Sequence, residues 1–182
     1  MRWEEFKLFS YLFMGVRYKD KAKGLLEKVK DRKYYPTVAE ILQILENENR
    51  DALATEFTRC LINDYGGLKC PPYESWYREG TIYGRVVADL LRLYAQYGLN
   101  PEREMPDHIA TELEFVAFLL FAGQNEVAEE FLARHLLVWA PKLAEDIMAN
   151  NYGKYTFLLG KALKEFVEEV SEELSNRQEN SQ

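Results

Sequence analysis

The sequence predicts an all-α protein, a compact bundle of about eight to ten helices, and three observations support this prediction. Apolar residues recur at steps of three and four along most of the chain, which is the spacing of one helix face. No segment alternates apolar and polar residues over more than about four positions, as a half-buried strand would. The chain has 182 residues, of which 47% are hydrophobic, so it is long enough to bury a core.

The N-terminal half is predicted to hold several amphipathic helices. The first helix is expected to bury an aromatic face, whose residues recur at steps of three and four: Trp3, Phe6, Phe9, Leu12, Phe13 and Val16. Thr37 and Glu40 have the spacing of a capping box, so a further helix is expected to begin there. Another predicted helix, at residues 53–61, is followed by DYGG at 64–67, whose glycines can take the left-handed conformation that ends a helix.

A polar segment with two prolines, NPEREMPD, separates two predicted lobes. It follows a helical pattern at residues 81–97 and precedes a helix that Asp107 is expected to cap. The polar end of the chain, SNRQENSQ, is expected to be disordered. The prediction is an N-terminal helical lobe (1–98), a hinge (99–106), a C-terminal helical lobe (107–175) and a disordered tail (176–182).

The C-terminal lobe is predicted to surround one apolar helix. Residues 115–122 (FVAFLLFA) are apolar on nearly every face, which places them at the centre of the fold. A helix at 124–138 is expected to end before Pro141, because the residue before a proline avoids the helical region. A shorter helix at 142–148 is expected next, and the last helix begins after Gly153.

Charge and length exclude several classes of protein. A net charge of −7 makes nucleic acid and anionic membranes poor partners and favours a cationic ligand. The longest apolar run, residues 115–122, is far shorter than the roughly 20 residues of a membrane-spanning helix. The N-terminal sequence MRWEEFKLF carries glutamates where a secretory signal has only positive charge, so we expect a protein that is not exported. We interpret Cys60 and Cys70 as reduced thiols in the cytoplasm.

The sequence offers no pattern for a metal, cofactor or catalytic site. Its two histidines, His108 and His135, and its two cysteines contain no pair at the short spacing of a structural zinc site. Glycine-rich phosphate loops and the H-E-x-x-H motif are also absent from the sequence. We expect no bound metal or cofactor. We interpret His135 as a packed residue, because Phe131 and Trp139 lie four positions away on the same helix face.

Asp107, His108 and Glu112 form the most suggestive polar cluster. His108 and Glu112 are one helical turn apart, and Asp107 lies at a helix N-terminus beside the hinge. This pattern fits a general acid and base. It also fits an N-cap aspartate followed by a solvated histidine, and spacing alone favours this second interpretation.

The stretch KCPPYESWYREG, residues 69–80, interrupts the helical pattern. Its two prolines end a helix, and Tyr73, Trp76 and Tyr77 follow them closely. These aromatic side chains are either buried plugs of a turn or the wall of a peptide groove. A groove is physically reasonable because a rigid backbone loses little entropy on binding and aromatic rings offer broad apolar faces. The spacing leaves both interpretations open.

Three segments together resemble the TorD/DmsD family of molybdoenzyme maturation chaperones. They are CPPYESWY (70–77), MPDHIATELEFVAFL (105–119) and FLARHLLVWAPKLAE (131–145), in the order of the family's signature segments. The second segment is the most specific, because an aspartate-histidine pair follows a hinge and opens a glutamate-rich apolar helix. The chain departs from the family pattern at Glu74 and Trp76.

The resemblance implies an all-helical cytoplasmic chaperone, and not an enzyme, that binds the twin-arginine signal peptide of a molybdopterin oxidoreductase. It implies that the chaperone holds this partner back from export until the cofactor is inserted. The long hinge leaves both a monomer and a domain-swapped dimer open. The positions that the resemblance ties to signal-peptide binding are Pro72, Tyr73, Gly84, Asp107 and His108, and Tyr77 and Glu112 also match motif positions.

The chemistry of such a peptide agrees with the resemblance. A twin-arginine signal is cationic at its start and apolar in its middle, so its receptor should offer carboxylates beside an apolar groove. Asp107, Glu112 and Glu74 are the expected carboxylates, and the aromatic residues of 73–77 are the expected groove.

Two other classes of function are consistent with the same residues. One is a helical adaptor that docks a folded oxidoreductase subunit through an exposed aromatic patch. The other is an enzyme, for example one that consumes a nucleotide, working through Asp107 and His108.

Overall fold

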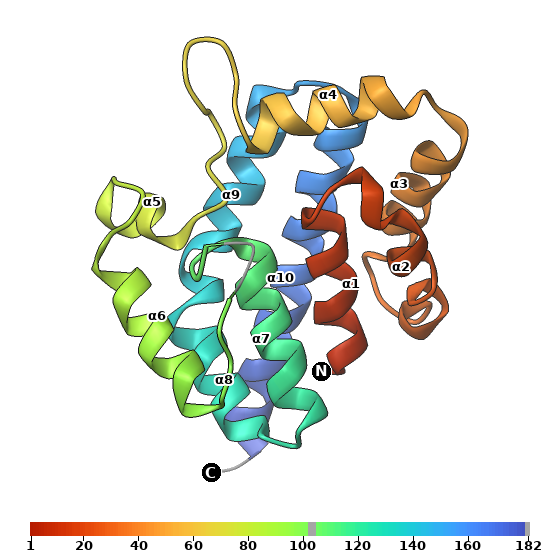
Figure 1. Ribbon diagram of the computed structural model, residues 1–182. Helices are drawn as coiled ribbons and strands as arrows, with labels where there is room; N and C mark the ends of the chain where they lie inside the picture. The colour runs from red at the N-terminus through yellow and green to blue at the C-terminus, as the bar shows by residue number, and fades with distance from the viewer. Residues whose placement is uncertain (102–104, 181–182) are drawn as a thin grey trace.

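The computed structural model describes residues 1–101 and 105–180 and confirms the all-α prediction (Figure 1). Within these residues the chain forms ten α-helices, two short 3-10 helices and no strand. One isolated antiparallel bridge is also present. None of the helices described is both long enough and apolar enough to cross a bilayer. The α-helices are α1 (Trp3–Phe13), α2 (Lys19–Lys23), α3 (Tyr35–Asn47), α4 (Arg50–Leu61), α5 (Glu74–Glu79), α6 (Arg85–Gln96), α7 (Ile109–Phe121), α8 (Asn125–Arg134), α9 (Leu136–Asn150) and α10 (Lys154–Asn180), and the 3-10 helices are η1 (Val16–Tyr18) and η2 (Leu26–Val29).

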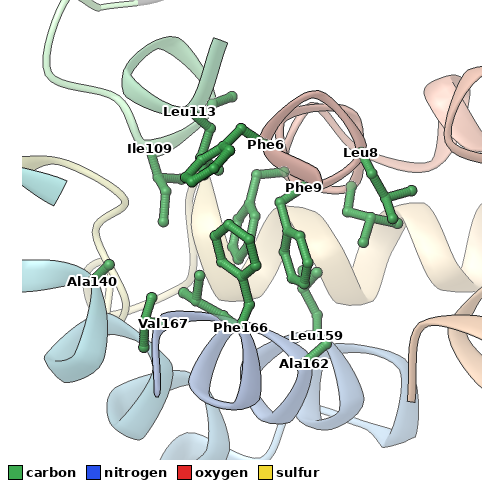
Figure 2. Packing of buried hydrophobic residues seen from close by; sticks show 14 of the residues in the cluster. Phe6, Leu8, Phe9, Ile109, Leu113, Ala140, Leu159, Ala162, Phe166 and Val167 are labelled. Carbon is green, nitrogen blue, oxygen red and sulfur yellow. The ribbon is translucent and has the colours of Figure 1, made fainter. Parts of the chain in front are cut away.

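Most of the aromatic face predicted for residues 3–16 lies in the core. Phe9 of α1 stacks on Phe166 of α10 with ring centroids 4.2 Å apart, and Phe6 meets the same ring edge-on at 5.1 Å (Figure 2). Tyr34 adds another edge-on contact to Phe166 at 5.5 Å. Contacts of this kind add about 0.5–1.5 kcal/mol each to the burial of the rings. One aromatic cluster therefore holds the first and last helices together.

Residues of both predicted lobes share a single hydrophobic core. α7 lies along α1, and Ser10 Oγ of α1 donates a hydrogen bond to the carbonyl of Ala110 at 2.9 Å. α9 and α10 also lie side by side (Figure 1). The predicted hinge contains residues 102–104, which lie outside the described residues, so the division into two lobes stays a prediction.

Two helix boundaries differ from the prediction in the middle of the chain. α3 begins before Thr37, with Pro36 in its first turn, so the predicted capping box is wrong. α9 continues through Pro141 instead of ending before it. The buried side chains of Trp139 and Leu143 lie on either side of this proline, and their burial offsets the roughly 3 kcal/mol cost of a proline inside a helix.

The end of the chain also differs from the predicted tail. α10 extends to Asn180, whereas the sequence predicts disorder from residue 176 onward. Arg177 pairs with Glu129 of α8 at 2.9 Å, and this ion pair links the polar end of α10 to the rest of the bundle. Residues 181–182 lie outside the described residues.

Candidate functional site

An antiparallel backbone bridge joins the proline corner to the start of α7. It pairs Tyr73 with His108, whose rings meet edge-on with centroids 5.4 Å apart. The bridge therefore brings together two of the segments that carry the family resemblance. Its two amide-to-carbonyl hydrogen bonds, each 2.9 Å long, run from Glu74 to Asp107 and from Ile109 to Pro72.

Asp107 caps α5 and not α7. The prediction that it caps the helix that follows it in the sequence is therefore wrong. Its Oδ2 atom accepts hydrogen bonds from the backbone amide of Ser75 at 3.0 Å and from the Ser75 hydroxyl at 2.5 Å. The aspartate is fully buried, and its Oδ1 atom has no hydrogen-bond partner among the described residues. In this conformation Asp107 organises the proline corner from inside the protein.

His108 is itself the N-cap of α7. Its Nδ1 atom accepts a hydrogen bond from the amide of Ala110 at 3.1 Å, so the proton of the neutral ring is on Nε2. Burial lowers the pKa of His108 to about 4, because the charged imidazolium loses its hydration. His108 is therefore buried and neutral. The prediction of a solvated histidine, which spacing alone favours, is wrong.

Glu112 is a fully buried carboxyl group one turn into α7. Its Oε2 atom accepts a hydrogen bond from the indole nitrogen of Trp139 at 3.1 Å. Burial, the negative charge of Glu74 and a hydrogen bond shared with Glu74 together raise the pKa of Glu112 well above its ordinary value. This shift favours the protonated form of Glu112 beside Glu74.

Glu74, the first residue of α5, is the charged partner in this buried carboxyl pair. Burial opposes its ionisation, but hydrogen bonds from His135 and Arg78 outweigh that effect and lower the pKa of Glu74. The His135 Nδ1 atom lies 3.0 Å from Glu74 Oε2. His135 also stacks on Phe131 with centroids 4.8 Å apart, which confirms the predicted packing. Sequence reasoning missed its contact with Glu74.

Tyr77 links α5 to α9. Its hydroxyl donates a hydrogen bond to Asp146 Oδ2 at 3.2 Å, and its ring stacks on Trp139 with centroids 5.6 Å apart. Burial, together with the negative charge of Asp146 and this hydrogen bond, raises the pKa of the Tyr77 phenol. The side chain is half-buried, so part of the ring still faces solvent.

Gly84 precedes α6 at the point where the carboxylate of Glu79 caps that helix. This carboxylate accepts hydrogen bonds from the amides of Arg85 at 2.9 Å and Val86 at 3.0 Å. A β-carbon on Gly84 would lie 2.5 Å from the Glu79 carboxylate. A side chain at this position would therefore push the Glu79 carboxylate away from the two amides that it caps.

The nitrate reductase delta subunit family model matches residues 30–145 of the chain. This range includes the proline corner, the whole of α7 and the histidine of the carboxyl network. The chain belongs to this family. The family match covers more than half of the 182 residues.

Individual members of the family are similar to the chain over part of their length. The chlorate reductase assembly chaperone protein of Ideonella dechloratans is 30% identical over 63% of this chain and 68% of its own. The Tat proofreading chaperone DmsD of Salmonella typhi is 26% identical over 59% of this chain and 55% of its own. The match to DmsD confirms the resemblance seen in the signature segments.

A solved structure matches nearly the whole fold. A crystal structure assigned as a redox enzyme maturation protein from Archaeoglobus fulgidus superposes with a TM-score of 0.71 at 30% sequence identity. The match covers 92% of this chain and 94% of that one. The helical arrangement in Figure 1 is therefore shared with that protein.

In this member of the delta subunit family the aromatic residues of the proline corner divide between core and surface. Tyr77 packs against α9, as a plug would, whereas Trp76 is 40% exposed. Tyr83, just before α6, is 74% exposed. Tyr77 therefore fits the interpretation of a buried plug, whereas the peptide groove stays a prediction for the exposed part of the segment.

The three expected carboxylates have partners inside the protein. Glu74, Asp107 and Glu112 are each fully buried, and none is offered to solvent in this conformation. Ser75, which supplies both hydrogen bonds to Asp107, was not singled out from the sequence. Only the four-residue step from Glu74 to Arg78, the spacing of a helical ion pair, could have indicated a local partner.

Replacing Gly84 by alanine is expected to lower the free energy of unfolding by about 1 kcal/mol, the usual value of a helix cap. The new β-carbon would displace the Glu79 carboxylate and release the two amides that it caps. Chemical denaturation measures the loss. The matched control is the double variant, because Gly84→Ala should cost much less when Glu79→Ala has already removed the cap. An equal cost in both backgrounds would contradict this explanation.

Proposed function

We propose that this protein is a cytoplasmic maturation chaperone that binds the twin-arginine signal peptide of a molybdopterin oxidoreductase before export. The single observation that carries the proposal is the backbone bridge between Tyr73 and His108, which unites two signature segments in one place. The names of the relatives support it, since one is a chlorate reductase assembly chaperone and another a Tat proofreading chaperone.

The proposed peptide site has an outer and an inner part. Trp76 and the partly exposed rings of Tyr73 and Tyr77 would contact the apolar segment of the peptide. The net charge of −7 would attract its cationic start. The inner part would set the shape of the corner from beneath. The proposed site residues are Pro72, Tyr73, Tyr77 and Gly84, with Asp107, His108 and Glu112 as the inner part.

A synthetic signal peptide with two adjacent arginines is expected to bind with a Kd in the micromolar range, about −8 kcal/mol. Changing both arginines to alanine should weaken binding about tenfold, about 1.4 kcal/mol, because the peptide loses two positive charges that the net charge of −7 attracts. Isothermal titration calorimetry measures both affinities. Added salt should weaken only the arginine peptide.

The matched control is a peptide with two lysines, which keeps the charge and removes the planar guanidinium groups. Binding of the lysine peptide at an intermediate affinity would assign part of the recognition to geometry. Equal affinities for the arginine and alanine peptides would contradict the proposal that the positive charge of the arginine pair contributes to binding.

The exposure of Trp76 and Tyr83 also favours a second candidate function, an adaptor that docks a folded oxidoreductase subunit. A mature oxidoreductase without its leader would then bind to the chain. Retention of this binding in the presence of excess signal peptide would assign the two partners to different surfaces.

A further inference from the structure

One arginine of the protein itself occupies a buried carboxylate beside the proline corner. Arg78, in the last turn of α5, donates hydrogen bonds from its Nη1 atom to Glu74 Oε1 and, at 3.2 Å, to the main-chain carbonyl of Arg134. An ordinary ion pair on a helix surface leaves both groups in solvent. Here Glu74 is fully buried, whereas the side chain of Arg78 is 39% exposed. The guanidinium group therefore reaches from the surface to a carboxylate inside the protein.

Two acceptors from different helices form a guanidinium socket at this point. One is the carboxylate of Glu74 at the start of α5, and the other is the carbonyl of Arg134, the last residue of α8. A helix C-terminus carries partial negative charge, so both acceptors favour a cation. His135 Nδ1 lies 3.1 and 3.0 Å from the two carboxylate oxygens of Glu74. Glu74 therefore keeps one partner inside the protein when the guanidinium of Arg78 leaves.

We propose that the guanidinium socket binds one arginine of the twin-arginine signal peptide, and that Arg78 fills the socket in the free protein. The arginine of the peptide would displace Arg78, whose partly exposed side chain can turn into solvent. The identity of the incoming arginine rests on the proposed function. The socket itself can be tested without any peptide.

The contacts of the three expected carboxylates single out Glu74. Among the described residues it is the only one of the three that forms an ion pair. Asp107 accepts its hydrogen bonds from Ser75, and neither of these donors is charged. Removing the cation from a buried carboxylate is costly unless another cation replaces it. Exchange of one guanidinium for another avoids this cost, because both offer the same charge and the same planar donors.

The position of the socket agrees with the proposed peptide site. Arg78 is on the same short helix as Trp76 and Tyr77, whose rings are proposed to contact the apolar segment of the peptide. In a twin-arginine signal the cationic start precedes the apolar middle, so the sites for the two parts must be neighbours. Residues 76–78 meet this requirement within a single helical turn.

The first test uses Arg78→Ala and a small probe, N-acetylarginine amide. The probe should raise the melting temperature of this variant, because a ligand of the folded state stabilises it. It should also shift the imidazole resonances of His135, which contacts Glu74. The unmodified protein should show neither effect, because its own arginine fills the socket. N-acetyllysine amide is the matched probe and should act more weakly. Adding Glu74→Gln to the variant should abolish both effects.

The second test compares affinities for the signal peptide by isothermal titration calorimetry. Arg78→Ala should bind the arginine peptide about three- to tenfold more tightly than the unmodified protein, because an internal competitor lowers the apparent affinity. Its affinity for the alanine peptide should not change. Arg134→Ala is the matched control, because it removes an exposed arginine that pairs with Glu130 at 3.1 Å but keeps the carbonyl of the socket. This control should change the affinity much less.

The outcomes separate the socket from the proposed function. Absence of probe binding to Arg78→Ala, or probe binding that survives Glu74→Gln, would overturn the socket. An unchanged or weaker affinity of Arg78→Ala for the arginine peptide would overturn the displacement. If no variant bound the arginine peptide while the probe still bound, the proposed function would fail and the socket would stand. Where Arg78→Ala folds poorly, Arg78→Met removes the guanidinium but keeps the apolar stem, and the same results are expected.

Discussion

Replacing Asp107 by alanine is expected to lower the free energy of unfolding by about 2–4 kcal/mol, because it leaves two buried donors of Ser75 without an acceptor. Each unsatisfied buried donor costs about 1–3 kcal/mol, and α5 also loses its cap. Urea denaturation measures the loss. Since α5 carries Trp76 and Tyr77, the same variant should also weaken binding of the signal peptide.

Asp107→Asn is the matched control, because asparagine keeps an acceptor for Ser75 and removes only the charge. If Asp107 acts by shaping the corner, the asparagine variant should be more stable than the alanine variant and should bind the peptide nearly as well as the unmodified protein. A loss of peptide affinity in Asp107→Asn without loss of stability would mean that the carboxylate itself meets an arginine.

Lowering the pH from 7 to 4 is expected to remove about 3 kcal/mol of stability through His108 alone. The pKa of His108 is about 4 in the folded protein, below the ordinary value of 6.5. The unfolded chain therefore takes up a proton as the pH falls below 6.5, while the folded chain stays neutral until about pH 4. The contribution is fully present above pH 6.5 and is lost as the pH falls toward 4.

His108→Asn isolates this contribution, because asparagine is a good N-cap for α7 and does not titrate. The unmodified protein should lose stability relative to this variant between pH 7 and 4, as urea denaturation at several pH values would measure. Titration of the imidazole by NMR supplies the pKa directly. A stability difference that does not change with pH would contradict a buried neutral histidine at this position.

Local sequence patterns predicted most of the helices, because residues three and four positions apart lie on the same face of a helix. The aromatic face of α1 and the apolar α7 were both identified in this way, and both contribute to the core, although Phe121 at the end of α7 is 72% exposed. The predictions that failed depend on distant contacts. The spacing of Thr37 and Glu40 indicates a cap, but α3 begins earlier, and Pro141 interrupts the pattern without ending α9.

The carboxylates of the site illustrate the limit of this reasoning. Asp107 lies next to α7 in sequence, yet it caps α5, whose first turn is about 30 positions earlier in the chain. Glu74 raises the pKa of Glu112, and His135 contacts Glu74 from the end of α8. No spacing rule relates residues so far apart.

The sequence by itself determined the helical class, the negative charge and the family, because each of these is recorded in composition or in short contiguous segments. Only the tertiary structure decided which carboxyl groups are buried, which one has a raised pKa and which helix Asp107 caps. Burial and hydrogen bonding of a polar group depend on the elements that surround it, and these elements come from distant parts of the chain.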